Sequence, residues 1–134
     1  MESLTLSATI PSTPEQVFDA WVHPELHAQM TGGAANGETG PGGKFTAWDG
    51  YITGQFLELE RPGRIVMAWR TLDFPKGAPD SRVEISLSAQ GEGEALATAL
   101  TLSHTQIPKG QGDQYRGGWA QFYFDPMVAH FSKG

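Results

Sequence analysis

The chain has 134 residues, of which 39% are apolar and 18% are charged, which is the composition of one folded domain rather than of a disordered segment. The formal net charge is −6 and the nine basic residues are scattered, so we expect neither a nucleic-acid partner nor membrane insertion. The chain has no cysteine, which excludes disulfides, thiolate metal sites and a catalytic thiol. We expect a single domain, residues 1–134, located in the cytoplasm, because the start lacks a signal-peptide pattern and no apolar run approaches the roughly 20 residues of a membrane span.

The first part of the chain predicts one strand followed by two short helices. In residues 3–10 (SLTLSATI) apolar and polar residues alternate, which is the two-residue period of a strand with one solvent-facing side. Thr13 is a candidate N-cap of the first helix, and Gln16 would complete a capping box. This helix should end at His23, because Pro24 disfavours helical geometry in the residue before it. Pro24 can itself open the second short helix.

The middle of the chain predicts a series of antiparallel strands. A glycine-rich loop, residues 31–43, precedes them, and its glycines open a strand rather than a helix, so we do not expect a phosphate-binding loop. Its remaining functional interpretation is a mobile flap over a cavity. Within residues 51–60, apolar side chains point to both faces, which a bulge near Gly54 would reconcile. The five strands are 44–48, 51–60, 64–70, 81–88 and 95–105, with turns at Asp49-Gly50 and Pro62-Gly63.

The last segment, residues 116–131 (RGGWAQFYFDPMVAHF), predicts a long helix with more than one apolar face. It holds five of the fourteen aromatic residues, and Pro126 should kink it. Burying one tryptophan is worth up to about 5 kcal/mol and an interior proline costs about 3 kcal/mol, so packing outweighs the kink. This helix either fills the core or lines an apolar cavity. The sequence therefore predicts an α+β fold, with an antiparallel six-stranded sheet curled around a long C-terminal helix and two short helices between strands 1 and 2.

No arrangement of residues in the sequence predicts catalysis, a cofactor or a metal site. His23 and His27 are four residues apart, but a proline between them breaks the helical register and the ligands of a zinc site are too few. We interpret His23 as a helix N-cap and His27 as a surface residue. His104 ends the inward face that Leu100 and Leu102 share. A neutral imidazole there could hydrogen-bond a ligand, act as a base, or be a satisfied histidine at the edge of the core.

Three stretches carry a family resemblance: residues 10–25, residues 42–70 with the patterns W-D-G and W-R, and residues 117–131 with the pattern G-W-x-x-x-Y. Together they resemble the activator of 90-kDa heat-shock protein (Hsp) ATPase homologue-like family, in the START/birch-pollen-allergen-like (SRPBCC) superfamily. The resemblance implies a helix-grip fold with an apolar cavity between the sheet and the terminal helix. Such cavities bind lipids, hormones or polyketides in this superfamily, and some members are cyclases or hydrolases.

The resemblance and the strand alternation together predict which residues line this cavity. They are inward residues of the later strands and the terminal helix: Met67, Trp69, Val83, Leu100, His104, Trp119, Phe122 and Tyr123. We therefore expect a protein, monomeric or homodimeric, that binds an apolar or amphipathic small molecule without catalysing a reaction. The eukaryotic activators of the family add a separate N-terminal domain, for which 134 residues leave no room, so we expect ligand binding rather than chaperone activation.

Two alternatives to simple ligand binding remain. The first is a co-chaperone-like module that binds a protein partner through an exposed apolar patch. The second is a cyclase or hydrolase that uses the same cavity, in which His104 would need to meet a second polar side chain such as Gln55 or Tyr123. A closed apolar cavity of about 300 Å³ or more would favour the small-molecule function.

Overall fold

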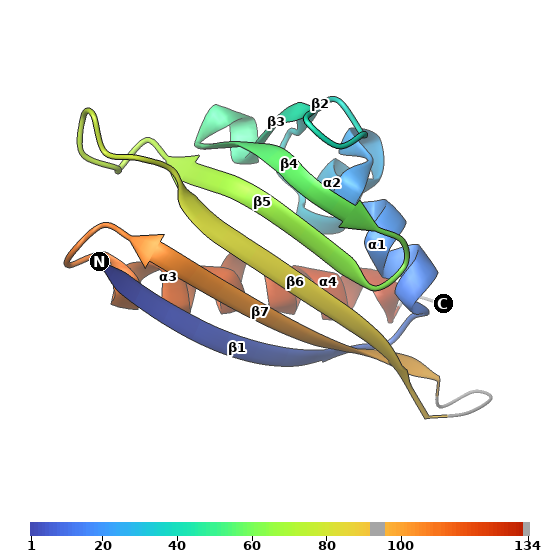
Figure 1. The fold of residues 1–134 in the computed structure, drawn as a ribbon. Coiled ribbons are helices and arrows are strands. Elements are labelled where there is room, and N and C mark those ends of the chain that lie inside the picture. Colours follow the sequence, from blue (N-terminus) through green and yellow to red (C-terminus); the bar gives the residue numbers. More distant parts are fainter. Residues whose placement is uncertain (92–95, 133–134) are drawn as a thin grey trace.

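The computed structural model describes residues 1–91 and 96–132, and in these residues seven antiparallel strands form one curled sheet. The strand order is β1-β7-β6-β5-β4-β3-β2. The terminal helical segment lies along one face of this sheet, and the two short helices lie near one end of it (Figure 1). This is the α+β helix-grip arrangement predicted from the sequence. The strands are β1 (Glu2–Ile10), β2 (Asn36–Gly37), β3 (Lys44–Ala47), β4 (Ile52–Glu60), β5 (Arg64–Thr71), β6 (Ser81–Gln90) and β7 (Ala97–Ile107).

The helices that follow β1 begin and end where the turn residues predict. The Thr13 hydroxyl accepts a hydrogen bond from the Gln16 backbone N–H at 3.2 Å, and His23 is extended at the junction of the two helices. The Gln16 side chain does not complete the capping box but accepts a bond from the Ser12 hydroxyl. No helix in the described residues is long and apolar enough to cross a membrane. The α-helices are α1 (Pro14–Val22), α2 (Pro24–Thr31), α3 (Gly112–Trp119) and α4 (Asp125–Phe131).

The sheet has one strand more than predicted, because the glycine-rich loop contributes the short edge strand β2. Asn36 pairs with Thr46, and Gly37 pairs with Phe45. Gly37 has φ +141°, and a Cβ at this position would lie 2.5 Å from the carbonyl oxygen of Lys44. Only glycine allows so close an approach. The mobility expected of this loop stays a prediction.

The hairpin between β3 and β4 is present, but its turn has four residues rather than two. Ala47 pairs directly with Ile52, so Trp48, Asp49, Gly50 and Tyr51 all lie in the connection. The φ angles of Trp48 and Asp49 are 50° and 60°, in the left-handed region that bulky residues seldom occupy. The turn is therefore wider and more strained than the Asp-Gly pattern predicts.

The predicted bulge in β4 exists, but its position was wrong. The register shifts between Phe56 and Glu58 rather than near Gly54. Gly54 serves close packing instead, since a Cβ there would lie 2.2 Å from the Ala68 carbonyl oxygen and 2.6 Å from the Phe45 ring. The later bulge still reconciles the two faces of the strand, because after the shift Leu59 pairs with Ile65 and packs against the core on the same face as Phe56.

A π turn, rather than an isolated proline, interrupts the regular α-helix of the terminal segment. The π turn spans Ala120–Phe124, and the Asp125 N–H bonds to the Ala120 carbonyl oxygen five residues earlier. Pro126 then lies in the first turn of α4, where its missing N–H costs least. Four of the five side chains that this segment buries recur every four residues, namely Tyr115, Trp119, Tyr123 and Met127, and the fifth is Phe124.

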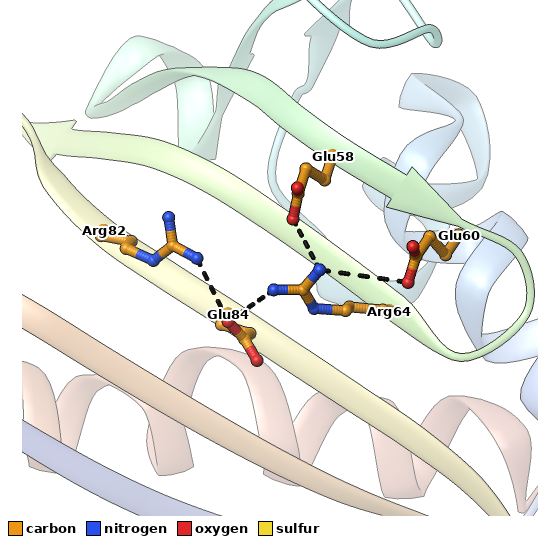
Figure 2. Close-up of polar contacts among 5 residues, drawn as sticks. All are labelled: Glu58, Glu60, Arg64, Arg82 and Glu84. Atoms are coloured by element: carbon orange, nitrogen blue, oxygen red, sulfur yellow. Dashed lines mark hydrogen bonds and ion pairs between the residues drawn. The ribbon is translucent and has the colours of Figure 1, made fainter.

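The opposite face of the sheet carries charged side chains. Arg64 lies among three glutamates, 2.6 Å from Glu58, 3.2 Å from Glu84 and 4.0 Å from Glu60 (Figure 2). Arg82 also pairs with Glu84, at 3.3 Å. Glu58 and Glu60 are exposed to solvent. This network marks the solvent-facing side of the sheet, so any enclosed apolar site lies on the side of the terminal helix.

Candidate ligand-binding site

A cavity of about 390 Å³ lies between the terminal helical segment and the part of the sheet near the β3–β4 turn. Its volume is within the range of small-molecule sites in proteins. Seven of its ten lining residues are aromatic. The lining residues are Trp48, Tyr51, Ile52, Trp69, Gln114, Tyr115, Gly118, Trp119, Phe122 and Tyr123.

The eight residues predicted to line a cavity divide into two groups. The cavity lies closer to β4 than the prediction placed it, because the indole of Trp119 packs against the later strands and fills the space there. Four of the eight line the cavity: Trp69, Trp119, Phe122 and Tyr123. The other four lie in the core instead: Met67, Val83, Leu100 and His104.

Six lining residues were not predicted, although the sequence held a signal for most of them. Trp48 and Tyr51 belong to the stretch with the W-D-G pattern, which carried the family resemblance. The sequence alone did not assign this stretch to the cavity wall. Gln114 and Gly118 precede Phe122 at four-residue intervals on the terminal segment, so helical periodicity from Phe122 would have found them. The two remaining residues are Ile52 and Tyr115.

His104 is fully buried, and both of its ring nitrogens are hydrogen-bonded within the core. The Trp119 indole N–H donates to Nδ1 at 3.1 Å, so Nε2 carries the proton and donates to the Ser81 hydroxyl at 2.8 Å. Ser81 in turn donates to the Trp69 carbonyl oxygen at 2.8 Å. Burial lowers the pKa of His104 to about 4. Neither nitrogen is available to a ligand, so His104 is a satisfied core histidine in this arrangement.

In the described residues His104 bonds to Ser81 and Trp119 and not to Gln55 or Tyr123, so the contact that the enzyme alternative would need is not formed. The predicted surface position of His27 is wrong. The Tyr123 hydroxyl lies 2.9 Å from Nε2 of His27, which is buried, while Nδ1 of His27 donates to the Trp21 carbonyl oxygen at 2.9 Å. Burial lowers the pKa of His27. Gln55 donates to a backbone carbonyl of the glycine-rich loop. Across residues 1–91 and 96–132, no three His, Asp or Glu side chains gather as metal ligands.

A polar cluster borders the cavity where β5 leads into the next loop. The Tyr51 hydroxyl donates to the Asp73 carboxylate, and Nε2 of Gln114 donates to the same carboxylate oxygen at 2.8 Å. Nε2 of Gln114 also lies 3.2 Å from the Tyr51 hydroxyl. The bonds from Tyr51 and Gln114 lower the pKa of Asp73, so its carboxylate is ionised at neutral pH. Two lining residues thereby hold a negative charge in a fixed position.

Trp48 combines a strained backbone with an unsatisfied side chain. Its indole N–H is the one buried side-chain polar atom without a hydrogen-bond partner in the part of the chain that the structure describes. The ring packs edge-on against Phe122, 5.5 Å between centroids, and a Cβ on Gly33 would lie 2.5 Å from it. Backbone strain and unpaired polar groups concentrate at ligand-binding positions. Both features of Trp48 occur in a residue of the cavity wall.

The comparison with known proteins agrees with the family predicted from the sequence. Residues 11–132 match the family described as "Activator of Hsp90 ATPase homolog 1-like protein". The human "Activator of 90 kDa heat shock protein ATPase homolog 1" is 30% identical over 131 residues, which is 98% of this chain. The chain spans only 37% of the length of that relative.

Solved structures share the fold. The crystal structure of an HSP90 activator from Plasmodium falciparum has a TM-score of 0.82 and 24% sequence identity, covering 96% of this chain and 95% of that chain. The solution structure of the Aha1 dimer from Colwellia psychrerythraea has a TM-score of 0.72 and 12% identity, covering 96% of each chain. With the sequence match extending over nearly all of the chain, the protein belongs to the activator of Hsp90 ATPase homolog 1-like family.

Proposed function

We propose that the protein binds an apolar or amphipathic small molecule in the cavity between the β3–β4 turn and the terminal helical segment. The observation that carries the proposal is the lining itself, in which aromatic residues predominate around a volume of about 390 Å³. Burying apolar ligand surface there is favourable by about 25 cal/mol per Å².

Two neighbouring glycines of α3 allow a matched test of this site. A Cβ on Gly118, which lines the cavity, would meet only the Phe122 ring, at 3.9 Å, so a leucine side chain can enter the cavity there. A Cβ on Gly117 would meet nothing within 4 Å, and this residue is exposed. Gly118→Leu therefore fills the site, while Gly117→Leu adds the same side chain outside it.

The probe is 1-aminoanthracene, a flat apolar fluorophore that is neutral at pH 7. Its fluorescence should rise with wild-type protein and with Gly117→Leu, and should not rise with Gly118→Leu. Equal binding by the two variants would place the probe elsewhere and contradict the proposal. Native mass spectrometry of gently purified wild-type protein would add the identity of any resident ligand, as a discrete mass that disappears on denaturation.

A second candidate function is binding of a protein partner in the manner of a co-chaperone. The family and the name of the human relative favour it. Leu72 is 76% exposed, and its backbone N–H donates to the Tyr51 carbonyl oxygen at 3.0 Å, which places an exposed apolar side chain beside the cavity. Phe122 of the cavity wall is also exposed, at 45%. Exposed apolar groups near one another are typical of protein interaction sites.

The test of this second function is the rate of ATP hydrolysis by an Hsp90-type chaperone, with the protein added in excess. Stimulation by the wild type that Leu72→Ser abolishes would support it. An unchanged rate at saturating protein would count against it. The Colwellia psychrerythraea relative is described as a dimer. Light scattering after size-exclusion chromatography would decide whether this protein is a monomer or a homodimer.

A further inference from the structure

We infer that the cavity selects ligands that carry a positive charge beside a flat apolar ring system, and that Asp73 is the residue that selects the charge. This inference rests on the proposed function, because it names the class of ligand that the same cavity takes. It is carried by the aromatic faces of the wall, by the position of one carboxylate, and by the absence of basic residues from the ten that line the cavity.

The aromatic wall of the cavity is a cluster of rings in contact with one another. The Trp69 ring lies 5.2 Å from that of Trp119 and 5.2 Å from that of Tyr115, measured between centroids. Trp119 in turn lies 5.0 Å from Tyr123. The face of an aromatic ring is the negative part of its quadrupole, so clustered rings attract cations, most strongly where water is excluded. Flat ring systems also stack on such faces, which accounts for the apolar half of the ligand.

Asp73 places a full negative charge one hydrogen bond away from two lining residues. Tyr51 and Gln114 both donate to the same oxygen, Oδ2, of its carboxylate. Among the described residues, no Lys, Arg or His pairs with Asp73. Arg70, which is close in sequence, pairs instead with Asp80 at 2.9 Å. An amine at this end of the cavity would therefore supply the counter-ion that the carboxylate lacks.

The same features disfavour ligands that carry a carboxylate or a phosphate. An anion that enters the cavity loses hydration, and none of the ten lining residues is an Arg or Lys that could replace it. The anion would also lie close to the Asp73 carboxylate, in a protein of formal net charge −6. Free fatty acids and phosphorylated compounds are thus poor candidates, while flat ring compounds that carry an alkylamine group, which is a cation at neutral pH, are good ones.

A set of ligands that share one ring isolates the effect of charge. We would titrate 2-naphthylmethylamine, which is a cation at pH 7, 2-naphthylmethanol, which is neutral, and 2-naphthoate, which is an anion, by isothermal titration calorimetry. All three ligands carry the same naphthalene ring, so the contacts of this ring with the cavity wall should be the same in each. A cation over aromatic faces with a nearby carboxylate should bind about tenfold more tightly than the alcohol, and the carboxylate ligand should bind more weakly than either.

Asp73→Asn removes the charge but keeps an oxygen that accepts from Tyr51, and it should lower the preference for the amine to about threefold. Asp113→Asn is the control. It removes one negative charge, as Asp73→Asn does, but Asp113 lies on α3 and does not line the cavity. An amine preference that Asp73→Asn leaves intact would overturn the role of Asp73.

Equal binding of all three ligands, blocked by Gly118→Leu, would overturn the charge preference and leave the proposed function standing. Binding of none of them, or binding that Gly118→Leu does not affect, would overturn the proposed function and this inference with it.

Discussion

Lowering the pH from 7 to 5 should destabilise the protein, because His104 stays neutral in the folded state and takes up a proton in the unfolded state. Its pKa is 6.5 in an unfolded chain and about 4 in the fold. This difference corresponds to roughly 3 kcal/mol of stability that is present above pH 6.5 and is lost progressively down to about pH 4. By pH 5 about 2 kcal/mol of it should be gone. His27, whose pKa burial also lowers, acts in the same direction.

The structure explains why protonation of His104 is so unfavourable. A proton on Nδ1 would replace the lone pair that accepts the Trp119 N–H, and two donors would then face each other in the core. Carboxylates with lowered pKa values, such as Asp73 and Glu84, also lose stabilising contacts in acid. They do so below their unfolded values of 3.8 and 4.5, so the interval from pH 7 to 5 reports on histidine.

The assay is urea unfolding followed by tryptophan fluorescence at pH 7, 6 and 5. In His104→Gln the amide can accept a hydrogen bond from Trp119 and donate one to Ser81, but it does not titrate. Between pH 7 and 5 the free energy of unfolding of this variant should therefore fall by about 2 kcal/mol less than that of the wild type. His23→Gln, which changes an exposed histidine, should follow the wild type. The reasoning is refuted if His104→Gln shows the same loss of stability between pH 7 and 5 as the wild type.

Three further predictions concern stability at neutral pH, each measured by urea unfolding. Tyr123→Phe should cost about 1–3 kcal/mol, since it leaves Nε2 of the buried His27 without its donor; a loss under about 0.5 kcal/mol would contradict the bond. Gly54→Ala should cost about 1–3 kcal/mol through its clash with the Ala68 carbonyl oxygen, and unchanged stability would show that the strands can separate there. Gly117→Ala should stabilise α3 by about 0.5–1 kcal/mol, and a destabilised variant would mean that this position is not open.

The strands and helices could be predicted because they follow from local pattern and turn chemistry. Val83, Ile85 and Leu87 alternate in the sequence and are all buried on one face of β6. Thr13 caps the first helix as predicted. Leu96 falls within the predicted strand 95–105, but it lies just before β7 and is 36% exposed. A two-residue period alone does not show where a strand begins.

The contents of the site could be predicted only in part, because they depend on contacts between distant segments. His27 was expected at the surface, since nothing near it in sequence indicates its bond to Tyr123, which comes 96 residues later. Trp69 and Trp119 were predicted to line a cavity and do so, because alternation and helical spacing direct both inward. The volume of the cavity between these two rings and Trp48 depends on how the rings pack and on the wide form of the turn that carries Trp48. Neither the packing nor the width of this turn follows from a local sequence pattern.

The π turn has a consequence for how the length of the terminal segment can vary. Four of its five buried side chains, Tyr115 to Met127, recur every four residues. An α-helix has 3.6 residues per turn, so each interval of four advances about 40° around the axis. Over three intervals Met127 would point about 120° away from Tyr115, and the wider turn takes up part of this drift. Deleting the exposed Gln121 would convert the π turn into a regular α-helix, in which Met127 would still point within about 20° of the direction of Tyr115. Related chains that lack one residue of this turn should therefore keep the same side chains on the sheet.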